Sequence, residues 1–237
     1  MIEYSLYGLS ILAMIFSIWA QIKVSSTFRK YSSVRTRSGM YAAQVAENVL
    51  HNAGIYNVKV ERIGGSLTDH FDPRTNTLRL SDSVYGSDSA AAIGVAAHEA
   101  GHAIQHAVGY NPIKIRASLV PAVNFASKFT WILIFLGALL MGFSGDTGLG
   151  YNVMLFGVIL FAVVALFQLV TLPVEFNASR RAMAALRDSG RYTADELTAS
   201  RRVLTAAALT YVAALAVSLV QLLRLVISLS NSRDRRR

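Results

Sequence analysis

The sequence predicts a mainly α-helical membrane protein, with about four transmembrane helices and a small α+β unit. Apolar residues make up 53% of the 237 residues and charged residues only 16%, against about 25% charged residues in a typical soluble domain. The apolar residues gather in four stretches, 4–22, 122–143, 151–173 and 203–229. Each stretch is close to the ~20 residues that cross a bilayer core. A polar segment of soluble composition separates the first two stretches.

The distribution of charge indicates a membrane topology. The formal net charge of +9 comes from basic residues near the ends of the apolar stretches, without interleaved exposed aromatic residues. This pattern argues against a nucleic-acid partner and, by the positive-inside rule, places the basic side in the cytoplasm. The other side receives only Glu3 and a short loop around Asp146. The basic residues are Lys23, Arg29, Lys30, Arg35, Arg37, Lys114, Arg116, Arg180, Arg181, Arg187, Arg191, Arg201 and Arg202.

The last apolar stretch leaves two topologies open. If residues 203–229 cross the membrane, the tail RDRRR ends on the outer side, against the positive-inside rule. If they do not cross, they form a re-entrant or interfacial helix. Arg224 lies within this stretch, where it would have to snorkel towards a membrane surface.

Five segments follow from these patterns. We expect a transmembrane helix in 1–24, a cytoplasmic α+β segment in 25–117 and two transmembrane helices in 118–174. A cytoplasmic helix would occupy 175–202, and a fourth transmembrane helix with the basic tail would occupy 203–237. The absence of cysteine excludes thiolate ligands and nucleophiles and leaves the redox compartment open.

The polar segment has the pattern of a small α+β unit. Apolar spacing predicts a helix over 38–51, capped by Ser38 and ended by Gly54. Alternation predicts strands in NVKVERI, 57–63, and TLRLS, 77–81, with a turn at TDHFDP, 68–73, between them. A further helix, capped by Ser87 or Asp88, would run to Gly109.

That further helix carries the motif HEAGH. His98 and His102 are four residues apart, so they lie on one helix face and their imidazoles can converge on one ion such as Zn²⁺. Glu99 follows the first histidine, where it can reach a water molecule rather than the ion and act as a general base. The alternative is a core helix with exposed histidines, but neighbouring alanines and glycines leave room around the rings.

A catalytic zinc ion needs three protein ligands and one open position. Glu175 is the leading third ligand, because it is the only acid between Asp146 and Asp188 and lies on the predicted cytoplasmic side, as His98 does. Pro173 would begin a helix there, with Ser179 one turn after Glu175 on the same face. The alternative is an acid at a helix N-terminus, favoured by the helix dipole.

Four other residues are candidates for contacting the substrate or supporting the ligands: His70, His106, Ser179 and Arg180. His102 and His106 are also four residues apart and could bind one ion together, but Ala103 then stands where the general base should be. His106 cannot share an ion with His98, because eight helical residues span about 12 Å. His70 lies in the predicted turn, which could lean over the metal.

HEAGHAIQH, a distant EFNASRRA and an upstream LTDHFDPRTNTLRLS, flanked by apolar stretches, resemble the YugP-like neutral zinc metallopeptidases of bacterial membranes. The likeness covers most of the chain. A more distant likeness is to the HtpX and Ste24 membrane gluzincins, which have an aspartate where Ser179 stands here. The resemblance implies a zincin-like catalytic unit in a bacterial plasma membrane, with His98, His102 and Glu175 binding zinc and Glu99 as catalytic base.

We therefore expect a membrane-embedded zinc metalloendopeptidase that cleaves peptides or membrane proteins at a membrane-adjacent cytoplasmic site. TLRLS could be an edge strand that pairs with the substrate. Arg180 or Arg181 could stabilise an oxyanion or bind lipid phosphates. Two alternative hypotheses remain. One is a site-2-type intramembrane protease, whose HExxH histidines would lie within an apolar span, and the other is a non-proteolytic metal-binding scaffold or transporter. The oligomeric state is not predicted.

Overall fold

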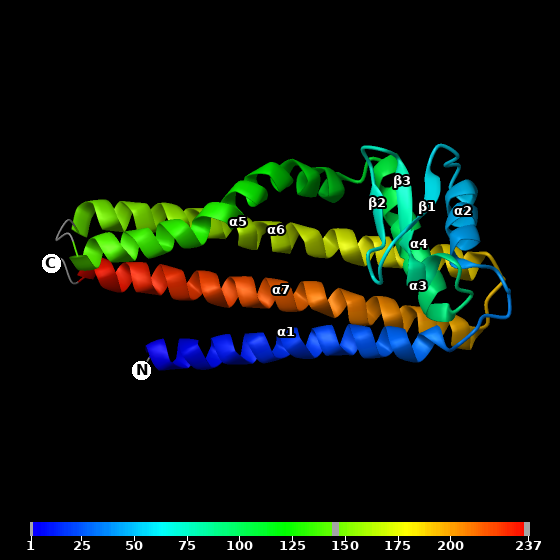
Figure 1. Cartoon of the computed structure of the whole chain (residues 1–237), viewed down its shortest axis with the longest axis horizontal. Helices are drawn as coiled ribbons and strands as arrows, with labels where there is room; N and C mark the ends of the chain where they lie inside the picture. Colours follow the sequence, from blue (N-terminus) through cyan, green and yellow to red (C-terminus); the bar gives the residue numbers. More distant parts are fainter. Residues whose placement is uncertain (1, 144–146, 235–237) are drawn as a thin grey trace. The chain divides into compact units, whose positions relative to one another are not determined.

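The structure, a computed structural model, describes residues 2–143 and 147–234. It is mainly helical with one small sheet, which confirms the predicted fold class. The predicted loop position Asp146 and the end of the basic tail lie outside the described residues. The elements shown in Figure 1 are α1 (Ile2–Ser32), α2 (Ala42–Asn52), β1 (Lys59–Ile63), β2 (His70–Asp72), β3 (Thr77–Ser81), α3 (Asp82–Tyr85), α4 (Ala90–Ala107), α5 (Asn111–Phe143), α6 (Thr147–Asp188) and α7 (Ala194–Asp234).

Four helices are long and apolar enough to cross a membrane, as predicted from the four apolar stretches. Judged by length and composition, these candidate spans are Ser5–Ser32, Asn111–Gly142, Gly148–Asp188 and Ala194–Asn231. Each extends beyond the apolar stretch that predicts it, because the helix continues into a polar end. The stretch 203–229 is helical throughout, within α7.

The chain forms two compact units. The helical unit contains Met1–Ile18, Ile115–Thr171 and Tyr211–Arg237. The mixed unit contains Trp19–Lys114 and Leu172–Thr210. The mixed unit therefore holds the whole sheet, α2, α3 and α4, together with segments of the long helices.

In the helical unit, large apolar side chains lie on the outside, as expected of helices that face lipid. Leu12 is 64% exposed and Phe135 is 71% exposed. The inside is packed through small residues: a Cβ added at Gly137 of α5 would lie 2.6 Å from the backbone nitrogen of Met154 in α6. Close backbone contact of this kind is a common way for membrane helices to associate.

Arg224 of α7 has partners from α1 within the helical unit. Its guanidinium lies 4.6 Å from the centre of the Tyr7 ring and donates to Ser10 Oγ at 3.4 Å. An aromatic face and a hydroxyl are suitable neighbours for a cation among apolar helices. The predicted snorkelling of Arg224 stays a prediction.

The sheet of the mixed unit has the strand order β1-β3-β2, with β1 parallel and β2 antiparallel to β3. The segment expected to be only a turn contains β2, because His70–Asp72 pairs with Thr77–Arg79. The expectation that TLRLS is an edge strand is wrong, since it forms the central strand β3. The edges of this sheet are β1 and β2.

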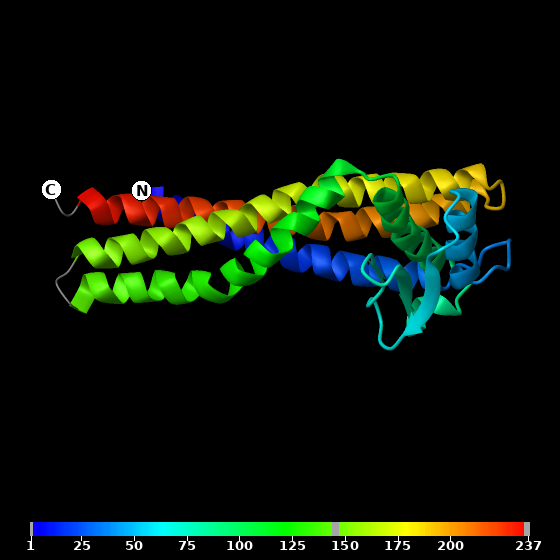
Figure 2. The same ribbon diagram turned by 90° about the horizontal axis from the view of Figure 1, so that it is seen from above.

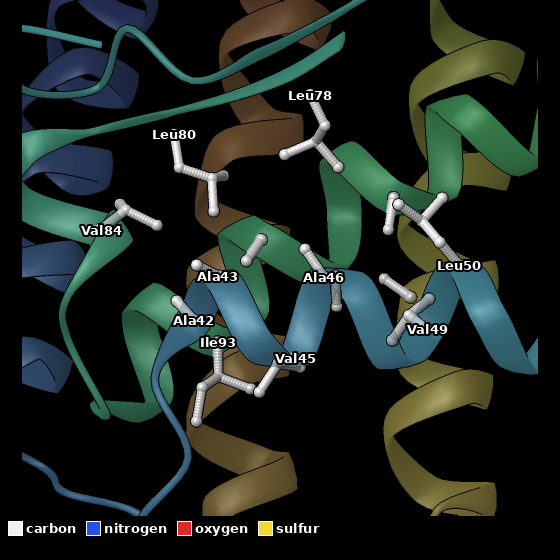
Figure 3. Packing of buried hydrophobic residues seen from close by; sticks show 14 of the residues in the cluster. Ala42, Ala43, Val45, Ala46, Val49, Leu50, Leu78, Leu80, Val84 and Ile93 are labelled. Carbon is white, nitrogen blue, oxygen red and sulfur yellow. The ribbon is translucent and has the colours of Figure 1, made fainter. Parts of the chain in front are cut away.

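The core of the mixed unit lies between this sheet and the short helices. Leu78 and Leu80 of β3 have no exposed surface, because alternation along the strand turns both towards the core. Figure 3 shows them pointing towards the apolar face of α2, near Ala43 and Ala46. In Figures 1 and 2 the short elements α2, α3 and α4 cluster around the three strands.

Two predicted helix starts are corrected. Helix α2 begins at Ala42 and not after a cap at Ser38. The backbone N–H groups of Thr36 and Ala42 donate to the carbonyls of Asp88 and Ser87, which holds residues 36–41 outside the helix. The cap of α4 is Ser89, whose hydroxyl accepts from Ala92 N at 3.2 Å, and not Ser87 or Asp88.

The start of a helix at Pro173 is also wrong. Pro173 lies inside α6, which runs without interruption from Thr147 to Asp188. The range 175–202 is consequently not one helix: it holds the end of α6, a turn around Gly190 and the start of α7. Because Glu175 lies far from either end of α6, the helix-dipole interpretation of this acid is removed.

Leu78→Ala should lower the free energy of unfolding of the mixed unit by about 2–5 kcal/mol, because the cavity left in the core cannot collapse fully. The measurement is pulse proteolysis of the detergent-solubilised protein in a urea series. Leu67→Ala is the control, since Leu67 is 47% exposed and its change should be within about 0.5 kcal/mol. Equal effects of the two variants would contradict the core described here.

Candidate metal centre

Helix α4 presents His98, Glu99 and His102. Its run of alanines favours helix, and the Ser89 cap fixes its first turn. The spacing of four residues places the two imidazoles together, with ring centres 4.8 Å apart and ring planes nearly perpendicular. Their side chains are 14% and 12% exposed. The histidines therefore converge at a site that is largely shielded from water.

Glu175 of α6 completes the cluster. Its Oε2 lies 3.3 Å from His98 Nε2 and 3.5 Å from His102 Nε2, and its side chain is 3% exposed. One ligand atom from each of the three residues lies within 4.8 Å of the others. The structure therefore brings together the three residues that the sequence suggests as zinc ligands. Their role as ligands stays a prediction.

These separations suit a zinc ion. Two atoms that each bind a tetrahedral zinc at about 2.0–2.1 Å lie about 3.3 Å apart, close to the two distances from Glu175. Two imidazole nitrogens and one carboxylate oxygen are also the donor set of many catalytic zinc sites, which keep the fourth position open. Residues His98, His102 and Glu175 would hold the ion.

Gly101 allows α4 to approach α6 at this point. A Cβ added to Gly101 would lie 2.6 Å from the carbonyl oxygen of Ala178, far inside normal contact distance. Ala178 follows Glu175 by less than one helical turn. The glycine within HEAGH therefore serves the site directly, because any larger residue would push the Glu175 segment away from the histidines.

Both histidines are held through their other ring nitrogen. His98 Nδ1 lies 3.1 Å from Ser179 Oγ, and His102 Nδ1 lies 3.0 Å from Gln105 Oε1. Such contacts orient the ring and leave Nε2 directed at the shared point near Glu175. The serine that stands in place of an aspartate of the distant gluzincin pattern therefore lies within hydrogen-bond distance of His98. The role of Ser179 in supporting a metal ligand stays a prediction.

Sequence reasoning does not single out Gln105. It has no exposed surface, and its Nε2 donates to Val174 O at 2.8 Å and Asn177 Oδ1 at 3.0 Å in α6. One available signal was its position three residues after His102, on the same face of an otherwise alanine-rich helix.

The local charge favours a cation. Burial lowers the pKa of His102, but the hydrogen bond to Glu175 and the charges of Glu99 and Glu175 outweigh burial, so the pKa is raised above 6.5. Two carboxylates thus stabilise positive charge between them. Glu99 is half-buried and, within the described part of the chain, forms no hydrogen bond or ion pair, which leaves its carboxylate available for proton transfer.

The remaining candidates have partners outside the cluster or are exposed. His70 is in β2, with Nδ1 2.9 Å from Thr68 O. His106 is exposed near the end of α4, and its ring meets the edge of Phe71 with centres 6.0 Å apart. Arg180 is exposed, whereas Arg181 donates from Nε to Asn177 Oδ1 at 2.8 Å. In the described part of the chain, no hydrogen bond, ion pair or ring contact joins His70, His106 or Arg180 to the three clustered residues.

Comparison with known proteins places the chain in a class of enzymes. The sequence model of a family described as "Putative neutral zinc metallopeptidase" matches residues 6–230. The match spans nearly the whole chain, and the protein belongs to this family. The resemblance inferred from the motifs is confirmed.

The chain is also similar to a bacterial protein named as a putative protease. It is 47% identical over 226 residues to the protein called "Putative membrane protease YugP" of Bacillus subtilis (strain 168). The alignment covers 95% of this chain and 97% of that protein. No solved structure matches the chain.

Gly101→Ala should weaken zinc binding by about tenfold or more, because separating the two helices moves Glu175 away from the histidines. The measurement is competition with a chromogenic chelator on the detergent-purified protein. Gly86→Ala is the matched control, since a Cβ at Gly86 would meet no atom within 4 Å. Unchanged affinity in Gly101→Ala would show that the helix approach is not needed for the site.

Proposed function

We propose that this protein is a membrane-embedded zinc metalloendopeptidase that hydrolyses peptide bonds at the His98, His102 and Glu175 cluster. The observation that carries the proposal is the convergence of these three side chains, one residue away from Glu99, which forms no hydrogen bond or ion pair among the described residues. The HExxH motif with a later glutamate is the ligand arrangement of a gluzincin. Membership in a zinc metallopeptidase family supports the choice of metal and of reaction.

Zinc bound by the three residues would act as a Lewis acid that polarises the scissile carbonyl and makes the attacking water more acidic. Glu99 would take the proton of that water and return it to the leaving amine. The hydrogen bonds of Ser179 and Gln105 would keep the two imidazoles in place during the reaction.

The substrate strand is reassigned to β2. Since β3 is the central strand, its backbone pairs with strands on both sides, and an extended peptide cannot add to it. β2 lies at an edge of the sheet, and the contact of Phe71 with His106 places it beside α4. Backbone pairing with β2 would bind peptides with little dependence on their side chains.

We propose that the site faces the cytoplasm of a bacterial cell, with the bilayer around the four apolar helices. The basic residues that flank the spans support this orientation through the positive-inside rule. In this arrangement the segments 25–117 and 175–202 carry the catalytic residues. Peptides or membrane proteins that reach the cytoplasmic surface would be the substrates.

Glu99→Gln should retain zinc and lose about 10²–10⁴-fold in turnover, because the general base is removed and the ligands remain. His98→Ala and Glu175→Ala should lose the metal. The measurements are elemental analysis of the purified proteins and cleavage of fluorescently labelled casein.

These variants also separate the alternative functions. A non-proteolytic metal-binding scaffold or transporter would bind zinc in the wild type but cleave no peptide, and Glu99→Gln would then change nothing. Zinc that is lost in His98→Ala but retained in Glu175→Ala would mean that another residue is the third ligand. A wild type without zinc would refute the proposed site.

Single-cysteine labelling should show the predicted orientation, because the chain has no native cysteine. A membrane-impermeant maleimide should label Ser144→Cys in intact cells, and label Asn52→Cys only after permeabilisation. Ser232→Cys should behave like Ser144→Cys if residues 203–229 cross the membrane. Labelling of Asn52→Cys in intact cells would place the proposed site outside.

A further inference from the structure

Gln105 is a fully buried side chain whose amide has a partner for every polar group. Its Oε1 faces His102 Nδ1 at 3.0 Å, and its Nε2 donates to Val174 O at 2.8 Å and Asn177 Oδ1 at 3.0 Å. A glutamine amide has two N–H donors and one carbonyl acceptor. All three have partners, so the chemistry of the partners determines where the oxygen and the nitrogen of the amide must lie.

The two partners of Nε2 are both acceptors. Val174 O is a main-chain carbonyl, which can only accept. Asn177 Oδ1 also accepts from Arg181 Nε at 2.8 Å. The guanidinium of arginine stays charged and can only donate, so it holds the oxygen of the Asn177 amide towards itself. The Gln105 amide therefore meets two oxygens on this side and must present its nitrogen to them.

The orientation of the Gln105 amide decides the tautomer of His102. With its nitrogen facing α6, the amide presents Oε1 to the histidine, and a carbonyl oxygen can only accept. The ring nitrogen that faces it, Nδ1, must therefore carry a proton. In the neutral imidazole this leaves the lone pair on Nε2, the atom that lies 3.5 Å from Glu175 Oε2.

His98 lacks this constraint. Its Nδ1 faces Ser179 Oγ at 3.1 Å, and a hydroxyl can donate or accept. Ser179 therefore tolerates either tautomer of His98. Of the two histidines, His102 is the one whose metal-binding nitrogen is specified by its neighbours.

We infer that Gln105 is a positioning residue that holds His102 in the Nδ1-protonated tautomer, with Asn177 and Arg181 fixing the orientation of its amide. The inference rests on the proposed zinc site, because it assigns Nε2 of His102 to the metal. The same side chain ties α4 to α6 at Val174, directly before Glu175. One glutamine thus supports two of the three ligands.

Two substitutions separate these two roles. Gln105→Met keeps the length of the side chain and removes every hydrogen bond. Gln105→Glu keeps an acceptor for His102 Nδ1 but replaces the two donors towards α6. If the tautomer matters, zinc affinity should fall about 10–100-fold in Gln105→Met and clearly less in Gln105→Glu, which loses the bonds to α6 but keeps the acceptor for His102 Nδ1. Gln21→Met makes the same chemical change at an exposed position of α1 and should bind zinc as wild type does.

The second measurement needs no metal, but it is made at a pH above the raised pKa of His102, where the neutral ring carries a single proton. Nitrogen-15 spectra of histidine-labelled protein, with the His102 signals assigned by their loss in His102→Gln, report which ring nitrogen carries the proton. Wild type and Gln105→Glu should show His102 protonated at Nδ1. Gln105→Met should show a mixture of the two tautomers.

The outcomes distinguish this inference from the proposed function. An unchanged His102 tautomer in Gln105→Met overturns the inference, as does an equal loss of zinc affinity in Gln105→Met and Gln105→Glu. In either case, the proposed function still holds if the wild-type protein binds zinc. A wild type that binds no zinc refutes the proposed function, and the tautomer spectra then decide the role of Gln105 alone.

Discussion

The candidate site depends on the close approach of α4 to α6. Helices usually pack with axes about 8–10 Å apart, at a distance set by the side chains between them. At Gly101 no side chain intervenes, and the backbone of α4 meets the carbonyl of Ala178. Because His98 and His102 flank this glycine and Glu175 lies within one turn of Ala178, the contact brings an acid to the histidines from a segment distant in sequence.

The close packing of α4 against α6 buries polar groups away from water, and these groups form hydrogen bonds with one another. Buried polar groups are costly unless they have partners. Gln105, with no exposed surface, satisfies its amide through α6 and His102. Glu175 faces both imidazoles. The polar network and the helix contact therefore require each other, since the network closes only when the two backbones are this close.

The small sheet has a supporting role in this arrangement. Leu78 and Leu80 of β3 pack into the core that also contains the apolar face of α4. This packing fixes the position of α4 relative to the sheet. With β3 in the centre, β2 is the edge strand whose Phe71 contacts His106 of α4. The HEAGH helix thus has packed apolar side chains on one side and the polar cluster with Glu175 on another. The sequence relatives support an enzyme built on this framework.

The sequence by itself determined the features that depend on local spacing. Four apolar stretches predict the long helices, and the separation of four residues in HEAGH predicts the pairing of His98 and His102, because helical periodicity is a local property. The sequence also predicts Glu175 as the third ligand, because it is the only acid between Asp146 and Asp188. The central position of β3, the passage of α6 through Pro173 and the buried contacts of Gln105 were decided only by the tertiary structure. Each depends on which distant segment lies alongside, and local periodicity carries no information about such partners.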